Sequence, residues 1–318
     1  MEHISETIAK MGSPRKQNGR LMPKCQAVEN EPQIIKTPKN CIECGVEYEA
    51  HTGEVLGVKI EFGGGYCPKC RAVKLEEQDR KEAEQKHYEQ ETMRRQFMDE
   101  SGIPMRFKGS RFTNFSINVD RSIISVYHEC KKFVEAFSFL NPRLSKSLVL
   151  YSSSVWGVGK THLACAVANS IIAKWAGEIM RCPVYFITEP QLFLKVRATF
   201  NRNHNEGQYQ ETEESIYKRL TTVPLLILDD VGKEDVSDPR FVQRVLFAII
   251  DGRYQNMLPI VMTANLNPDE LDAHLGGTRG NSASIDRLAE MTGNVFWEIR
   301  GKSYRDIANR RGIHGAQD

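Results

Sequence analysis

The run from Ser154 to Thr161 has the residue types and the spacing of a phosphate-binding loop. It follows the apolar stretch Leu148–Leu150 and precedes a helix-like pattern, which is the context that such a loop requires. Its backbone N–H groups would bind phosphate, Lys160 would reach the outer phosphates and the Thr161 hydroxyl would ligate Mg²⁺. Ser154 replaces the first glycine of the usual pattern, and an ordinary turn before a helix is the competing interpretation. The residues that we expect to contact the nucleotide are Ser154, Gly157, Val158, Gly159, Lys160, Thr161 and His162.

Two carboxylates, Asp229 and Asp230, end an apolar run that begins at Pro224. A buried parallel strand has such an uninterrupted apolar run, and ligands of open α/β sheets collect at the carboxyl ends of the strands. We expect Asp229 to hold Mg²⁺, directly or through water, and Asp230 to orient or deprotonate the attacking water. Asn265 ends another apolar run and would orient the same water or contact the γ-phosphate. Helix capping is the competing interpretation for all three side chains.

Four cysteines form two Cys-x-x-Cys pairs, Cys41 with Cys44 and Cys67 with Cys70, separated by 22 residues. This spacing is close to that of a zinc ribbon, in which two metal-binding turns are joined by a β-hairpin. Four thiolates complete a tetrahedral shell and leave no open position, so we expect a structural Zn²⁺. A redox pair is the alternative, but it needs a single Cys-x-x-Cys on a βαβ unit.

The bulk properties exclude several classes of protein. The net charge of +2 over 318 residues gives no global electrostatic case for nucleic acid. Eight cysteines in a chain of this length do not suggest a secreted disulfide scaffold. No apolar run reaches membrane-spanning length and no signal peptide is visible, so we expect a cytoplasmic protein with no membrane contact.

Alternating strand and helix patterns in the second part of the chain predict an α/β fold with a parallel sheet flanked by helices. The predicted strands are 147–151, 183–187, 224–229, 258–263 and 295–298, and the predicted helices include 160–175, 189–200, 239–255 and 281–291. Residues 73–102 are dense in charge and have too few apolar side chains to bury a face, which predicts an exposed linker helix ended by Gly102. The domains we predict are a flexible basic arm at 1–38, a zinc ribbon at 39–72, this linker, and an ATPase domain at 103–318.

The motifs Lys160-Thr161, Asp229-Asp230, Thr263-Ala-Asn265 and Asp286-Arg287-Leu288 together resemble AAA+ ATPases of the DnaC/DnaI helicase-loader type. The resemblance covers roughly residues 95–310, and an N-terminal cysteine module is similar to the DnaI-type arrangement. IstB-type transposition ATPases share the same core. The resemblance implies that Arg287 is an arginine finger acting in the neighbouring subunit's site, with Arg279 as the rival, and that Arg305 is the sensor-2 arginine. A surface salt bridge is the alternative for both Arg287 and Arg305.

The resemblance also implies a function, which is ATP-dependent loading of a ring helicase onto single-stranded DNA in DNA replication. ATP binding and hydrolysis would switch assembly and release, and subunits would associate through the ATP site. Basic and aromatic side chains in 193–220 suit a single strand, although interleaved glutamates make a solvated helical segment equally fitting. A transposition helper ATPase and a non-hydrolysing adaptor or decoy are the alternative functions. The short Asp230 side chain leads us to expect slow turnover.

Overall fold

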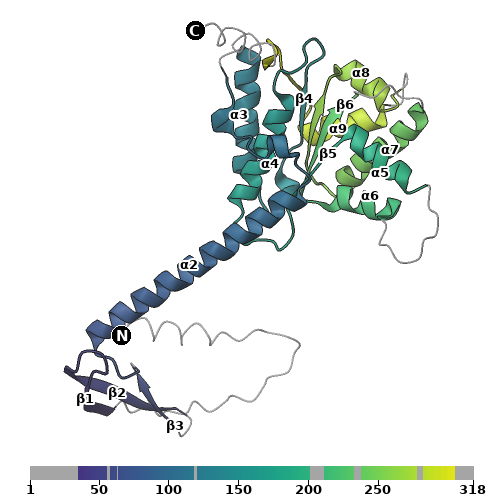
Figure 1. Cartoon of the computed structure of the whole chain (residues 1–318). Helices are drawn as coiled ribbons and strands as arrows, with labels where there is room; N and C mark the ends of the chain where they lie inside the picture. Colours follow the sequence, from purple (N-terminus) through teal and green to yellow (C-terminus); the bar gives the residue numbers. More distant parts are fainter. Residues whose placement is uncertain are drawn as a thin grey trace, which may run out of the picture. The chain divides into compact units, whose positions relative to one another are not determined.

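The computed structural model describes residues 35–55, 58–62, 64–117, 120–200, 211–232, 238–277 and 282–304 (Figure 1). The chain divides into two compact units, residues 1–83 and 84–318, and each is described by itself. The boundary lies within the long helix α2 (Pro68–Glu100). Most of the predicted basic arm lies outside the described residues, and its last positions belong to strand β1.

The first unit contains a three-stranded antiparallel sheet in the order β1-β2-β3. Its strands are β1 (Ile35–Asn40), β2 (Glu47–Val55) and β3 (Val58–Phe62). The predicted hairpin between the two cysteine pairs is present as β2 and β3, with Val55 opposite Val58. The sheet therefore brings the turn after β1 and the start of α2 into one unit, and these two segments carry the four cysteines.

The second unit is built on a five-stranded sheet whose strands are all parallel. Its members are β4 (Leu148–Tyr151), β5 (Val184–Thr188), β6 (Leu225–Val231), β7 (Ile260–Ala264) and β8 (Trp297–Glu298). Their order is β5-β6-β7-β4-β8, so the predicted parallel sheet is confirmed. Because β6, β7 and β4 are neighbours, the segments that follow them meet at one edge of the sheet.

Helices cover both faces of this sheet (Figure 1). Successive β6 residues alternate between two hydrophobic clusters. Leu225 and Ile227 belong to the cluster that includes α4, and Leu226 and Leu228 to the cluster that includes α7. This period of two explains why the strand has an uninterrupted apolar sequence. The helices are α3 (Arg121–Ala136), α4 (Lys160–Lys174), α5 (Glu189–Ala198), α6 (Glu213–Thr222), α7 (Pro239–Gln255), α8 (Pro268–His274) and α9 (Ala283–Thr292).

Two expectations about buried faces need correction. Apolar residues recur at helical spacing in the sequence at Ile124, Tyr127, Cys130, Phe133, Val134 and Phe137. In α3, however, Ile123 is buried and Ile124 is 38% exposed. The linker helix α2 is exposed over most of its length, yet near its C-terminal end Phe97 is buried and packs edge-on against Trp175, with ring centroids 5.1 Å apart. Gly102 follows the end of the helix with φ 75°, as expected of a helix-ending glycine. In the part of the chain that the structure describes, no helix has both the length and the apolar character needed to cross a bilayer.

Candidate nucleotide site

The glycines of the phosphate-binding loop have the backbone conformations that only glycine adopts readily. Gly157 and Gly159 have φ of 78° and 96°, and a Cβ on Gly159 would lie 2.6 Å from the ring of Phe115. Gly159 also caps the N-terminus of α4, and no side chain accepts a hydrogen bond at this cap. The first-turn N–H groups of a fifteen-residue helix are thus available to phosphate oxygens.

The predicted Mg²⁺ ligands are in direct contact. The Thr161 hydroxyl donates to both carboxylate oxygens of Asp229 at 3.0 and 3.1 Å, and Asp229 is only 2% exposed. Burial, opposed by a hydrogen bond from Thr263 and reinforced by the charge of Asp230, raises the pKa of Asp229 to about 6. A divalent cation bound here would stabilise the ionised carboxylate, so this hydroxyl–carboxylate pair fits Mg²⁺.

Thr263, at the end of β7, connects the two aspartates. Its hydroxyl donates to Asp229 Oδ1 at 2.6 Å and accepts the backbone N–H of Asp230 at 3.0 Å. The β6–β7 pairing shifts register between Leu228 and Val231, and Asp230 has a φ of 58°, a strained value for a residue other than glycine. This backbone distortion sets Asp230 apart from its neighbour Asp229: Asp230 lines a cavity over the loop, whereas Asp229 is buried.

That cavity has a volume of about 560 Å³ and brings together most of the predicted site. Its lining includes the predicted residues Gly157, Val158, Gly159, Lys160, Thr161, His162, Asp230 and Asn265. Ser154 is exposed and does not line it. Lys160 is 6% exposed, and its burial lowers the pKa of its ammonium group against the opposing charges of Asp230 and Asp229. A triphosphate bound here would meet the Lys160 ammonium group, the Thr161–Asp229 pair that can hold a cation, and the Asp230 carboxylate on the cavity wall.

One wall of the cavity was missed from the sequence. It is formed by residues between Arg106 and Ser116, none of which the sequence indicated as part of the site. His162 Nε2 lies 3.1 Å from Asn114 Oδ1, and Asn169 Nδ2 donates to the carbonyls of Phe107 and Ser110 at 3.0 and 2.9 Å. Asn169, a polar residue within the largely apolar run Leu163–Ile172 of α4, was an available signal. Tyr304 adds a further contact, because its N–H donates to the Gly157 carbonyl at 3.0 Å.

Arg287 lies on α9 and is bound within its own domain. Its guanidinium forms an ion pair with Asp251 at 2.8 Å and lies over the rings of Phe247 and Tyr254, 5.1 and 5.7 Å from their centroids. It does not line the cavity of its own chain, so its action in a neighbouring subunit stays a prediction. Arg279 and Arg305 lie outside the described residues.

The basic side chains proposed to contact DNA are partly engaged within the domain. Lys195 and Arg219 both form ion pairs with Glu211, at 3.2 and 3.4 Å, and Arg197 lies over the ring of Phe241. Arg202 lies outside the described residues. DNA binding by this segment stays a prediction.

The four cysteines of the first unit form a cluster that can hold a metal ion. The Sγ atoms of Cys41, Cys44, Cys67 and Cys70 all lie within 4.8 Å of one another. Hydrogen bonds from backbone N–H groups, that of Cys44 first, lower the pKa of Cys41 to about 6. Four thiol donors with backbone support for a thiolate fit a tetrahedral structural Zn²⁺. His51 is exposed, which agrees with a ligand set made only of cysteines.

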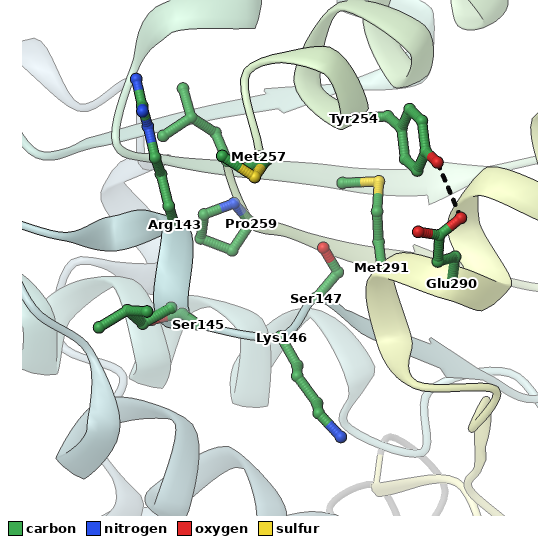
Figure 2. Close-up of a pocket in the computed structure, with 11 residues that line it drawn as sticks. Arg143, Ser145, Lys146, Ser147, Tyr254, Met257, Pro259, Glu290 and Met291 are labelled. Carbon is green, nitrogen blue, oxygen red and sulfur yellow. Dashed lines mark hydrogen bonds between the residues drawn. The ribbon is translucent and has the colours of Figure 1, made fainter.

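A second hollow, of about 250 Å³, lies at the other edge of the large sheet, where β4 and β7 begin (Figure 2). Tyr254 donates to Glu290 at 2.8 Å beside it. Figure 2 shows the basic side chains of Arg143 and Lys146 extending in different directions. This hollow therefore lacks the convergent groups found over the phosphate-binding loop, and none of the predicted nucleotide residues lines it.

The parallel sheet, the glycine loop on α4 and the Thr161–Asp229 pair define a P-loop nucleotide-binding core, preceded by a module with a four-cysteine cluster. The chain belongs to the family described as IstB-like ATP binding protein, which matches residues 132–312. It is 24% identical over 287 residues to the replicative helicase loader DnaI of Bacillus subtilis (strain 168), covering 88% of this chain and 81% of that protein.

Similarity to DnaC proteins is confined to a smaller part of the chain. The replicative helicase loader DnaC of Buchnera aphidicola subsp. Baizongia pistaciae is 29% identical over 218 residues, covering 68% of this chain and 75% of that protein. A crystal structure of the DnaC helicase loader matches 62% of this chain and 100% of its own, with 24% identity and a TM-score of 0.48.

Proposed function

We propose that this protein is an ATP-dependent helicase loader in DNA replication, which binds a replicative ring helicase and single-stranded DNA. The observation that carries the proposal is the extent of the similarity to the loader DnaI. The alignment with DnaI covers 88% of this chain, so it extends over the cysteine module. The match to the family begins at residue 132 and does not include that module. The ATPase core alone would fit a transposition helper equally well.

In the proposed reaction the triphosphate lies on the first turn of α4, where free N–H groups and Lys160 bind its oxygens. Thr161 and Asp229 would hold Mg²⁺, which supplies charge neutralisation to the outer phosphates. Asp230 accepts a proton from the attacking water or orients it, and Asn265 fixes the direction of that water. The position of Asp230 on the cavity wall supports this division of roles between the two acids.

The charge that develops on the γ-phosphate needs a further cation, and we assign this role to Arg287 from a neighbouring subunit, with Arg305 as the sensor. A trans arginine raises hydrolysis by on the order of a thousandfold or more. The rate of ATP hydrolysis thus depends on the association of subunits, so that hydrolysis acts as a timed switch. The cysteine module, with a structural Zn²⁺, and the linker would bind the helicase.

The deciding experiment is a pull-down of the replicative helicase from the same genome by the full-length protein, with and without ATP. We expect ATP-dependent association that is altered in Lys160→Ala, with Lys302→Ala as an exposed lysine control. Absence of association in both nucleotide states rejects the loader. Nucleotide-dependent filaments on duplex rather than single-stranded DNA would instead support the transposition helper. ATP hydrolysis that is lost in Lys160→Ala would exclude the non-hydrolysing adaptor.

A further inference from the structure

Glu189 is a fully buried carboxylate that the reaction outlined above does not use. It is the first residue of α5, directly after β5. One carboxylate oxygen accepts the backbone N–H of Gly232 at 2.8 Å, and the other accepts a hydrogen bond from His274 Nε2 at 2.7 Å. His274 is the last residue of α8, and Gly232 follows β6. One side chain therefore joins three segments that are distant in sequence.

Capping of α5 does not explain why the Glu189 carboxylate is buried. The N-terminus of α5 is already capped by Thr188, whose hydroxyl accepts the N–H of Gln191 at 3.3 Å, and the Gln191 side chain accepts the Thr188 N–H. A glutamate in a first turn gains about 0.3–2 kcal/mol from its interaction with the helix dipole. Complete burial adds a desolvation cost that only specific partners offset. The partners that offset it here are Gly232 and His274.

Gly232 is held tightly on its other side. Its φ is 80°, and a Cβ at this position would lie 2.3 Å from Leu266 Cδ1. Leu266 directly follows Asn265, whose N–H donates to the Val231 carbonyl at 3.4 Å. The Glu189 carboxylate and the Leu266 side chain thus fix the backbone two residues after Asp230. Asp230 has the strained φ, which persists only where the surroundings enforce it.

We propose that Glu189, supported by His274, is a positioning residue that holds the Asp230–Gly232 backbone and Asn265 in the arrangement needed for hydrolysis. The inference rests on the proposed function in so far as it requires turnover. Neither Glu189 nor His274 lines the nucleotide cavity. Their loss should therefore reduce the rate of hydrolysis and leave nucleotide affinity unchanged, because we assign the affinity to the α4 N-terminus, Lys160 and the Thr161–Asp229 pair.

The experiment compares Glu189→Ala, Glu189→Gln and His274→Ala with the full-length wild type. For each protein, kcat and the dissociation constant of a fluorescent ATP analogue are measured. Glu189→Ala should lower kcat by about tenfold or more, as expected of a small misplacement of a catalytic group, with affinity within about twofold. Glu189→Gln keeps an oxygen acceptor for Gly232 and a group that can pair with His274, so it should restore most of kcat. Thr199→Val is the control, because it removes one hydrogen bond at the other end of α5.

Hydrogen exchange at the amides of residues 229–232, measured without nucleotide, provides a readout that does not need turnover. Exchange there should accelerate in Glu189→Ala and not in Thr199→Val. A Glu189→Ala protein with wild-type kcat, or with unchanged exchange at these amides, overturns the inference. If the wild type shows no hydrolysis under any condition, the proposed ATPase function fails instead, and the exchange measurement still decides the positioning role.

Discussion

Replacement of Asp229 by asparagine should stabilise the protein in the absence of nucleotide and metal. Burial raises the pKa of this carboxyl from its usual 3.8 to about 6. A group whose pKa is higher in the folded than in the unfolded state favours folding below pH 3.8, and this contribution is lost as the pH rises through about 6. The difference between a pKa of 3.8 and one of about 6 corresponds to about 3 kcal/mol at neutral pH, which is an upper limit for the gain on removing the charge.

Asparagine suits the site because it preserves the hydrogen bonds. Its carbonyl oxygen can take the place of Oδ1 and accept from the Thr263 hydroxyl, which lies 2.6 Å from that oxygen. Its amide can take the place of Oδ2 and donate to the Thr161 hydroxyl. We therefore expect Asp229→Asn to raise the free energy of unfolding by about 1–3 kcal/mol at pH 7.5, with the difference falling to about 0.6 kcal/mol or less near pH 4. The assay is urea unfolding of the metal-free proteins at both pH values. Asp269→Asn, at an exposed position on α8, is the matched control and should change the value by less than about 0.5 kcal/mol.

When Mg²⁺–ATP is added, the Asp229→Asn protein should become less stable to unfolding than the wild type. At about 100 times its dissociation constant, a ligand stabilises the protein that binds it by about 2.7 kcal/mol, and Asp229→Asn should lose most of this gain along with hydrolysis. An Asp229→Asn protein that is no more stable than the wild type at pH 7.5 refutes the reasoning about burial. One that keeps full Mg²⁺–ATP stabilisation refutes the assignment of Asp229 as a metal ligand.

Three further predictions test other parts of the molecule. Gly159→Ala should abolish nucleotide binding in a fluorescence titration, because φ of 96° and contact with Phe115 leave no room for a Cβ, whereas Gly109→Ala, which meets open space on the cavity wall, should retain it. Arg287→Ala should lower the melting temperature, because it removes the ion-pair partner of Asp251 and the contacts with the rings of Phe247 and Tyr254. If Arg287 also acts in trans, mixing this variant with wild-type subunits should reduce hydrolysis more than in proportion to its share. Cys41→Ser should lower the zinc content measured by a colorimetric chelator, and Cys130→Ser, a change in the buried core outside the cluster, should not.

The central sheet was accessible from the sequence because its strands are buried on both faces. A strand such as β6 has a continuous apolar sequence ended by acids, and the ends of parallel neighbours must meet at one edge. That physical constraint was enough to bring Asp230 and Asn265 to the loop that carries Lys160. The cysteine cluster was equally accessible, because four ligands at a fixed spacing permit few arrangements.

Features that depend on a single contact were not accessible. Thr263 connects the two aspartates through its hydroxyl, and Asp230 has a positive φ. Neither feature produces a periodic pattern in the sequence. The buried face of α3 differed by one residue, because adjacent isoleucines at 123 and 124 satisfy the same helical pattern. Phe97 is one of two aromatic residues, with Tyr88, in a highly charged helix. The composition of the helix therefore predicts exposure, although the Phe97 side chain is buried.

The segment from Gln90 to Phe115 contacts α4 at both of its ends and in its middle. It thereby connects the end of the linker helix with the wall of the nucleotide cavity. Gln90 and Arg94 donate to the carbonyls of Ala176 and Trp175, beyond the C-terminal end of α4. Asn169, in the middle of the helix, is bonded to the segment as described above, and Phe115 contacts Gly159 at its N-terminus. The end of the linker helix and the wall of the nucleotide cavity are therefore one continuous stretch of chain held on one helix. Since α4 carries Lys160 and Thr161 at its first turn, a displacement of this stretch relative to the helix changes the shape of the cavity directly.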